Sequence, residues 1–235
     1  MSGTGQASGK IGAIAGVAFA VLLFLSVAMF NSLRGVTDQE LMEGWTDGGL
    51  RRDSIVSMYL MLLAAPCFLV FVSQLRARLR ALIPENSLVD LMYGAGIVFV
   101  SALSMTAFSR ALIAQAVRFW DEPLPGPDTL RYATSFSQSA FAVVAIPFAT
   151  IVVATASIMI LMSGAMSRWL GWLGLAVTVL SLVTIVLLMG PLATPLILIW
   201  VVGASALLFQ HHEPDVTTSN ALPSVTPTRT HQGVT

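Results

Sequence analysis

The chain has 235 residues, of which 56% are hydrophobic and only 10% are charged, and its mean hydropathy is +0.82. A soluble domain carries about 25% charged residues, so the composition excludes a globular protein whose whole surface faces water. The 12 basic and 12 acidic residues balance, which leaves no basic footprint for a nucleic-acid partner. We therefore expect the lipid bilayer to surround much of the chain.

Six apolar runs follow one another along the sequence, each near the roughly 20 residues that a helix needs to cross about 30 Å of hydrocarbon. The runs are continuous rather than alternating, and backbone groups in lipid must bond within a helix or a closed barrel, so we predict helices. The predicted fold class is an all-α, polytopic transmembrane helix bundle with about six spans. These spans are expected at residues 11–30, 55–73, 91–113, 140–162, 169–189 and 191–209.

The first apolar run has a second interpretation, a cleaved signal peptide, because Lys10 precedes it and Ser26-Val27-Ala28 faintly resembles a cleavage site. The run is long for that purpose, so a retained helix is favoured. Residues 1–9 are rich in Gly and Ser, and residues 211–235 are rich in Ser, Thr and Pro. Neither segment can bury a core, so we expect disordered tails on either side of a transmembrane domain spanning residues 10–210.

The long connection after the first span carries a helix signal. Thr37 and Glu40 have the spacing of a capping box, and Trp45 lies shortly after them. This pattern predicts a short helix at the membrane interface. Trp120 and Tyr59 are expected in the aromatic belt on the same side of the membrane.

Two further signals concern the ends of later spans. Ser87 and Asp90 form a looser capping box where the third span is expected to begin. The fifth and sixth runs are separated only by Gly190, and Pro191 suits the first position of a helix. One helix of about 40 apolar residues would overshoot the bilayer roughly twofold. We therefore predict that the fifth and sixth spans form a tight hairpin.

Six spans place both termini on one side of the membrane. The usual count of Lys and Arg in the loops is five against five and does not decide the orientation. The close spacing of three arginines in the loop after the second span favours termini in the cytoplasm. The basic residues on the side of the termini are Lys10, Arg76, Arg78, Arg80 and Arg168, and those on the opposite, outer side are Arg34, Arg51, Arg52, Arg118 and Arg131.

Arg110 is the one serious case of an ionisable residue inside a predicted span, and such residues are costly and by default mark candidate sites. It lies about one turn from the expected outer end of the third span, so snorkelling or a structural pair is favoured over contact with a substrate. We hypothesise that it pairs with an acidic residue of an outer loop, where Glu40, Glu43 and Asp47 lie.

Three other polar side chains of the third span form a stripe roughly opposite the face of Arg110, at about 100° per residue. A helix with polar residues on two faces is expected to lie inside the bundle, with helices on both sides and neither face open to lipid. If the helix continues, Arg118 would sit just outside the membrane and add to an outer polar cap. The candidate polar positions are therefore Arg110, Ser101, Ser104, Gln115 and Arg118.

Pro66 and Pro147 lie near the middle of the second and fourth spans, where a proline frees a backbone carbonyl and kinks the helix. Transporters use such breaks for binding sites, but proline is also ordinary in membrane helices, so structural kinks are favoured. The single cysteine, Cys67, excludes an internal disulfide or a cysteine metal cluster and is expected to be inert. Trp200, near the centre of the sixth span, is expected to pack against other helices.

Catalytic and cofactor signatures are missing from the sequence. The predicted spans hold no His, Asp or Glu at mid-membrane depth, which argues against haem ligation, an intramembrane metalloprotease and a carboxylate proton relay. The histidines His211, His212 and His231 all lie in the C-terminal tail, where two adjacent histidines make a weak metal site. No Gly-rich phosphate loop precedes a lysine. We assign no catalytic, cofactor-binding or metal-binding residues.

A family resemblance rests on the segment MSRWLGWLGL, residues 166–175, which runs into the fifth span, and on Pro191-Leu192 and Trp200-Val201-Val202 in the sixth. With the long outer loop after the first span and the arginine-rich loop after the second, these motifs resemble an uncharacterised family of bacterial six-span integral membrane proteins. The resemblance covers roughly residues 10–210. It implies six helices and a bacterial inner membrane, and it brings no catalytic or binding residues.

Three classes of function remain. A non-catalytic module that binds or regulates a partner, or senses the membrane, is favoured because the membrane centre lacks charges; its partner would be another membrane protein or a second copy of the chain. The alternative is a small permease or channel, which the prolines and the polar third span favour. An enzyme acting at the outer surface ranks last, because no outer histidine accompanies a nucleophile. A polar cavity beside Ser101, Ser104 and Gln115 would indicate the permease, and a packed interior would indicate the module.

Overall fold

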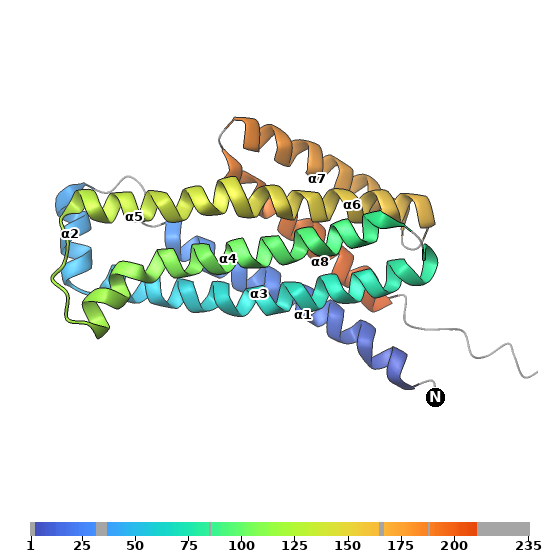
Figure 1. The fold of residues 1–235 in the computed structure, drawn as a ribbon, viewed down its shortest axis with the longest axis horizontal. Coiled ribbons are helices and arrows are strands. Elements are labelled where there is room, and N and C mark those ends of the chain that lie inside the picture. The colour runs from blue at the N-terminus through green and yellow to red at the C-terminus, as the bar shows by residue number, and fades with distance from the viewer. Residues whose placement is uncertain (1–2, 32–36, 85, 165–166, 188, 211–235) are drawn as a thin grey trace, which may run out of the picture.

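The protein is mostly helical over the residues that the computed structural model describes, which are 3–31, 37–84, 86–164, 167–187 and 189–210 (Figure 1). Within these residues, six helical segments are long and apolar enough to cross a membrane. They are Lys10–Met29, Gly49–Leu82, Ser87–Phe119, Pro127–Ser163, Arg168–Val186 and Gly190–Phe209. The predicted all-α polytopic bundle is confirmed, and the chain is a multi-pass membrane protein.

The first helix, α1 (Gly3–Asn31), contains the first predicted span and begins before it. Residues 3–9 are therefore helical, where a disordered tail was expected. Once a helix exists, each added residue gains a hydrogen bond without a new nucleation step, so the apolar run can extend its helix into a polar neighbour. The predicted C-terminal tail, residues 211–235, lies outside the described residues.

Two of the spanning helices are much longer than their apolar cores. The α3 helix (Gly49–Leu82) has 34 residues and α4 (Ser87–Phe119) has 33. At 1.5 Å per residue each is about 50 Å long, or about 20 Å more than the hydrocarbon layer. An untilted helix of this length continues beyond the hydrocarbon layer.

The fourth span is made of three consecutive pieces: α5 (Pro127–Ser139), a π-helical turn (Ala140–Ala145) and α6 (Ile146–Ser163). Pro147 explains the turn, because it lacks an N–H and its ring would clash with the carbonyl four residues earlier. The N–H of Ile146 bonds to the carbonyl of Phe141 instead, five residues back. By contrast, α3 continues through Pro66 without a change of helix type.

The predicted hairpin of the last two spans is confirmed. The α7 helix (Arg168–Val186) leads through a 3₁₀ turn (Gly190–Leu192) into α8 (Ala193–Gln210), and the two helices pack against each other. In Figure 1, α7 lies at the edge of the bundle, where it contacts α6 and α8.

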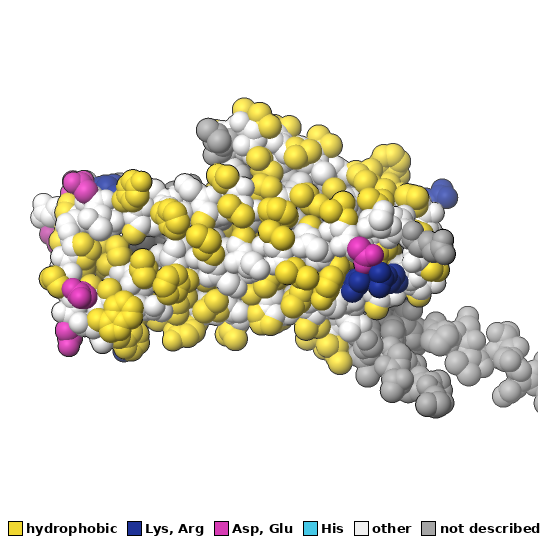
Figure 2. All heavy atoms as spheres, viewed as in Figure 1, with side chains coloured by type: hydrophobic (Ala, Val, Ile, Leu, Met, Phe, Trp, Pro, Cys, Tyr) yellow, Lys and Arg dark blue, Asp and Glu magenta, His cyan; other side chains and the backbone are white. Residues whose placement is uncertain are grey.

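The third span, α4, lies between α3 and α6, so the prediction of helices on both of its sides is confirmed (Figure 1). On one side, α1, α3 and α4 meet around a cluster of aromatic rings. The centroid of the Phe68 ring lies 4.7 Å from that of Phe19 and 4.6 Å from that of Phe99. Trp200 of α8 is also fully buried, in agreement with its predicted packing role. Hydrophobic side chains cover the visible flank of the bundle, and charged ones gather at its ends (Figure 2).

At one end of the bundle, a second and smaller hydrophobic core joins α2 (Asp38–Thr46), α4 and α5. Its buried members are Leu41 and Trp45 of α2, Ala114 of α4 and Leu130 of α5. We call this part the helical cap and define it as α2 together with residues 49–56 of α3, 111–119 of α4 and 127–136 of α5. In Figure 1 the cap lies beyond the turn between α7 and α8.

The predicted capping box at the start of α2 is confirmed, but the one at the start of α4 is wrong. The Glu40 N–H donates to Thr37 Oγ1 at 3.3 Å, and the Thr37 N–H donates to Glu40 Oε2 at 2.8 Å. At α4 the N-cap is Asn86, whose Oδ1 accepts from the Leu88 N–H at 2.9 Å. Asp90 is not available for a box, because arginines of α3 hold its carboxylate.

Replacing Thr37 with alanine should increase amide hydrogen exchange in α2 several-fold, because an N-cap side chain contributes on the order of 1 kcal/mol to its helix. The hydrogen bonds from Thr37 lower the pKa of Glu40. The stabilisation of α2 by the ionised Glu40 carboxylate is therefore complete above the ordinary pKa of a carboxyl group. It is lost as pH falls through the lowered pKa of Glu40. The protection factors of α2, in which the intrinsic effect of pH on exchange is divided out, should fall across that acidic range in the wild type and change less in Glu40→Gln, which keeps the Thr37 backbone N–H but has no carboxylate to titrate. Equal pH profiles would contradict this account.

Candidate functional site

Arg110 is the most deeply buried charged side chain that the structure describes, with 7% of its surface exposed. Its Nη1 donates to Ser57 Oγ at 2.8 Å, and to the carbonyl oxygen and Oγ of Ser26, each at 3.3 Å. The two serines also bond to each other: Ser26 Oγ donates to the Ser57 carbonyl at 2.9 Å, and Ser57 Oγ donates to the Ser26 carbonyl at 3.0 Å. We call Ser26, Ser57 and Arg110 the serine–arginine cluster. It ties α1, α3 and α4 together.

A neighbouring bond attaches the fourth span to the same region. Ser137 of α5 is fully buried, and its hydroxyl donates to the Thr106 carbonyl of α4 at 3.2 Å. Thr106 lies one helical turn before Arg110, so polar contacts from four helices gather around this part of α4.

The predicted pairing of Arg110 with a carboxylate of an outer loop is wrong for the residues that the structure describes. The ion pairs found among them involve other arginines. The loop carboxylates have closer partners: Asp38 Oδ1 accepts from Arg131 Nε at 2.8 Å, Glu40 caps α2, and Glu43 accepts from Gln39 at 2.9 Å. The capping of α2 and its contact with α5 thus hold these acidic groups within the cap.

The depth of the serine–arginine cluster follows from helix geometry. Residues 90 and 110 of α4 are about 30 Å apart along the helix axis, and residues 57 and 76 of α3 are about 28 Å apart. Each distance is close to one hydrocarbon thickness. If the ion pair between Arg76 and Asp90 marks one edge of the hydrocarbon, Arg110 and Ser57 lie at the other edge. The cluster then forms the floor of the helical cap.

The stripe of Ser101, Ser104 and Gln115 does not converge on a common site. Ser101 Oγ donates to the Ile97 carbonyl at 3.0 Å and Ser104 Oγ to the Val100 carbonyl at 2.9 Å, both within α4. Gln115 Nε2 donates to the sulfur of Met58 at 3.0 Å.

The expectation that both polar faces of α4 are covered is also wrong, because Ser101 is exposed on the outside of the bundle. A serine that bonds to its own helix needs no other partner and can face lipid at little cost. The last candidate of this span, Arg118, is exposed in the cap, about 12 Å beyond Arg110 along α4.

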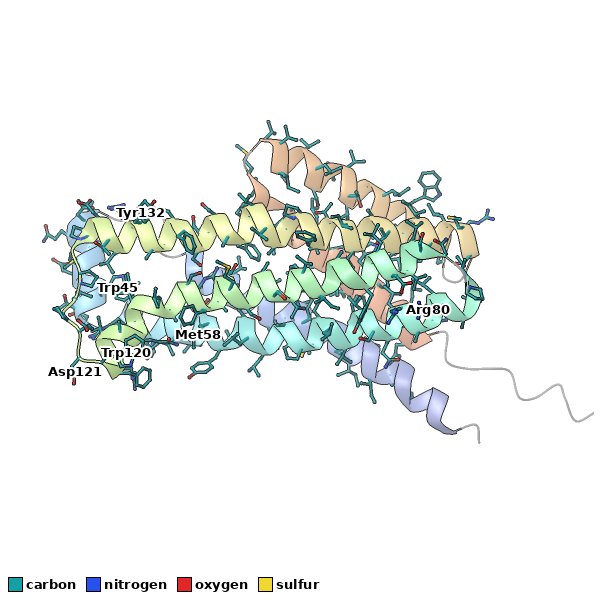
Figure 3. All side chains as sticks on the ribbon, viewed as in Figure 1. Trp45, Met58, Arg80, Trp120, Asp121 and Tyr132 are labelled. Carbon is teal, nitrogen blue, oxygen red and sulfur yellow. The ribbon has the colours of Figure 1, made fainter. Side chains whose placement is uncertain are left out.

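A charged cluster at the other end of the bundle was not predicted. Asp90 Oδ1 accepts from Arg76 Nη2 at 2.8 Å and from Arg80 Nη2 at 2.9 Å, and the Arg76 guanidinium lies 4.5 Å from the ring centroid of Tyr93. The sequence contained the signal, since the arginines of α3 are closely spaced, but Asp90 had been assigned to a capping box. This cluster closes the connection between α3 and α4, and Figure 3 labels Arg80 within it.

Within the described residues, no group of three or more His, Cys, Asp or Glu is placed to hold a metal ion. Cys67 is a free, half-buried cysteine in α3. The three histidines, His211, His212 and His231, lie outside the described part of the chain. Apart from the serine bonds within α4, the polar contacts described above thus lie between neighbouring helices, as in the serine–arginine cluster, or at the ends of helices, as around Asp90.

Comparisons with models of protein families, with curated proteins and with solved structures found no match to this chain. The resemblance to a bacterial family of six-span membrane proteins therefore stays a prediction. Function has to be argued from the bundle, the serine–arginine cluster and the helical cap.

Proposed function

We propose that the protein is a non-catalytic membrane module that binds a protein partner through its helical cap. One observation carries the proposal: helices that need only about 20 residues to cross the bilayer continue for several further turns and build a second hydrophobic core there. A connection between spans does not need such a core. A folded surface presented to partners does.

Exposed aromatic side chains support the cap as the binding surface. Trp120, at the end of α4, is 66% exposed, and Tyr132 of α5 is 79% exposed (Figure 3). Trp120 lies about 15 Å beyond Arg110, whereas the headgroup layer adds only about 5–8 Å to each side of the hydrocarbon. At that height Trp120 would be in water rather than in the aromatic belt where we had expected it. Exposed tryptophan and tyrosine are typical anchors of protein interfaces.

The packing inside the bundle favours a static scaffold over a transporter. The hydrogen bonds described for Arg110 join three helices, and the hydroxyls of Ser101 and Ser104 bond to their own helix. The rings of Phe19, Phe68 and Phe99 fill the space between α1, α3 and α4. These polar groups of α1, α3 and α4 are thus used for folding.

The cellular setting belongs to the same proposal. The resemblance to bacterial six-span proteins supports a location in a bacterial cell membrane. The cluster of Arg76, Arg78 and Arg80 at the end of the bundle that carries the termini supports a cytoplasmic position for that end. The helical cap would then face away from the cytoplasm.

Photocrosslinking in native membranes tests the cap. A photoreactive amino acid at position 120 or at position 132 should crosslink to one partner protein. The adducts from the two positions should have the same mass. The same group at Val179, an exposed residue in the middle of α7, should give no protein adduct because it faces lipid. Trp120→Ala should also abolish the adduct formed from position 132. Equal adducts at all three positions, or none in the cap, would refute the proposed interface.

A permease is the second candidate, favoured by the π-helical turn before Pro147, since such turns are frequent at functional sites. Cysteine accessibility separates the two functions. In a Cys67→Ser background, single cysteines at Ala107 and Ala111, both fully buried, should resist a water-soluble maleimide. A cysteine at Tyr132 should react at once and serves as the positive control. If a cysteine at position 107 reacts with maleimide added on one side of the membrane, the permease is favoured.

A further inference from the structure

The helical cap contains a cavity of about 180 Å³, lined by Gly48, Arg51, Arg52 and Arg118. Gly48 directly precedes α3, Arg51 and Arg52 lie in the first turn of α3, and Arg118 comes from the end of α4. The cavity is smaller than the pockets of about 300–1,000 Å³ that hold drug-sized ligands. Its size and its lining suit one small anion.

The positive charges around this cavity are only partly balanced. Arg52 Nε lies 3.9 Å from Asp53 Oδ1. Among the described residues, this is the one ion pair in which Arg51, Arg52 or Arg118 takes part. Arg51 Nη2 donates to the neutral carbonyl of Thr46 at 3.1 Å. The Nε of Arg51 is shielded from solvent and has no hydrogen-bond partner among the described residues. The lining of this cavity therefore carries three arginines, whose like charges repel one another, and the buried Nε of Arg51 is an unused donor.

The backbone adds to the same electrostatic preference. Gly48 is the N-cap of α3, with a φ of 81°, and it provides no side chain to bond the first N–H groups of the helix. The first turn of α3 carries no acidic residue. Free N–H groups and the positive end of the helix dipole both favour an anion. A Cβ atom at Gly48 would lie 3.3 Å from Arg51 Nη2, and the positive φ also disfavours other residues.

We propose that this cavity binds a phosphate-type oxyanion, held by Arg51, Arg52 and Arg118. Guanidinium groups bond such oxyanions through paired, charge-assisted hydrogen bonds. The anion has two possible sources. Arg52 lies about 7.5 Å beyond Ser57 along α3, within the headgroup layer if Ser57 marks the hydrocarbon edge, so a phospholipid phosphate can reach it as well as a free ion. The site depends on the cavity alone and not on the binding of a protein partner.

Inorganic phosphate, titrated at constant ionic strength against chloride, tests the site on the purified full-length protein in detergent. A free anion that binds only the folded state raises the melting temperature in a saturable way. Arg118→Gln and Arg51→Gln should each raise the apparent Kd about tenfold or more. Arg131→Gln, which removes the same charge from the cap outside the cavity, should leave the Kd unchanged. Without phosphate, Arg118→Gln should not lower the melting temperature, because it relieves repulsion.

Nanodiscs distinguish the two sources. If the ligand is the phosphate of an anionic lipid, whose charge no choline group balances, nanodiscs of phosphatidylglycerol should raise the melting temperature above that in phosphatidylcholine, and Arg118→Gln should abolish the difference. If the ligand is a free ion, inorganic phosphate should stabilise the protein in both lipids. The proposal is overturned if neither probe stabilises the wild type, or if Arg118→Gln and Arg51→Gln respond to both probes as the wild type does.

Discussion

Replacing Ser57 with alanine should lower the free energy of unfolding by about 1.5–3 kcal/mol, the usual contribution of a hydrogen bond to a charged group. The Ser57 hydroxyl accepts the 2.8 Å hydrogen bond from Arg110 and bonds to Ser26 across the interface between α1 and α3. Its loss leaves a buried cation with weaker solvation at the edge of the hydrocarbon. Arg110→Met should cost less than Ser57→Ala, because it removes the charge as well as its hydrogen bonds, and the two serines still satisfy each other.

A double-mutant cycle measures this coupling. Ser57→Ala should cost far less in the Arg110→Met background than in the wild type, which gives a favourable interaction energy between the two side chains. The control is Ser101→Ala in α4, the helix of Arg110. The Ser101 hydroxyl bonds to the backbone of its own helix, so the effect should stay within about 0.5 kcal/mol. Unfolding can be followed by circular dichroism during titration with a denaturing detergent. Additive costs would show that Arg110 does not depend on the serines.

The apolar runs predicted the spans because hydrocarbon imposes one length and one type of secondary structure on any chain that crosses it. That constraint ends where lipid ends. The predicted second and third spans therefore stopped near the membrane surface, whereas α3 and α4 continue to Gly49 and Phe119. In water, helix continuation depends on packing against α2 and α5, and local composition does not record such contacts. The helix α2 was predictable because its capping box is local.

The partners of Arg110 were missed for a related reason. Its acceptors come from Ser26 and Ser57, which are 84 and 53 residues away in the sequence. Serines in apolar helices usually bond to their own backbone, as Ser101 and Ser104 do. The sequence offers no sign of which serines turn toward a neighbouring helix. A charge-pair argument instead favoured the acidic loop residues, which the fold commits to α2 and α5.

Gly174 of α7 carries a role that the pattern of the fifth span did not reveal. A Cβ atom at this position would overlap Ser157 Oγ of α6 and the indole nitrogen of Trp200 in α8, and it would lie 2.9 Å from Ser157 Cβ. Ser157 and Trp200 are both fully buried. The absence of a side chain at position 174 therefore lets α6, α7 and α8 approach one another around the fully buried Trp200, as small residues do in other membrane helix interfaces.

Gly174→Ala should therefore destabilise the protein by about 2–3 kcal/mol, in the range of overpacked cores, and Gly174→Val should prevent α7 from docking. Gly94→Ala is the matched control, because a Cβ atom there would meet no heavy atom within 4 Å. That change should be neutral or stabilising by up to about 1 kcal/mol through helix propensity. The same denaturing-detergent titration compares them.

A second substitution separates steric overlap from any general intolerance of Gly174 to change. Ser157→Gly removes both the hydroxyl and the Cβ atom that a methyl group at position 174 would meet. In that background, Gly174→Ala should lose at least half of its cost, although Trp200 still limits the space. If Gly174→Ala is as harmless as Gly94→Ala in the wild type, the close approach of the three helices is not what holds the hairpin on the bundle. The fifth span would then be free to move against the rest, as a permease rather than a static scaffold would require.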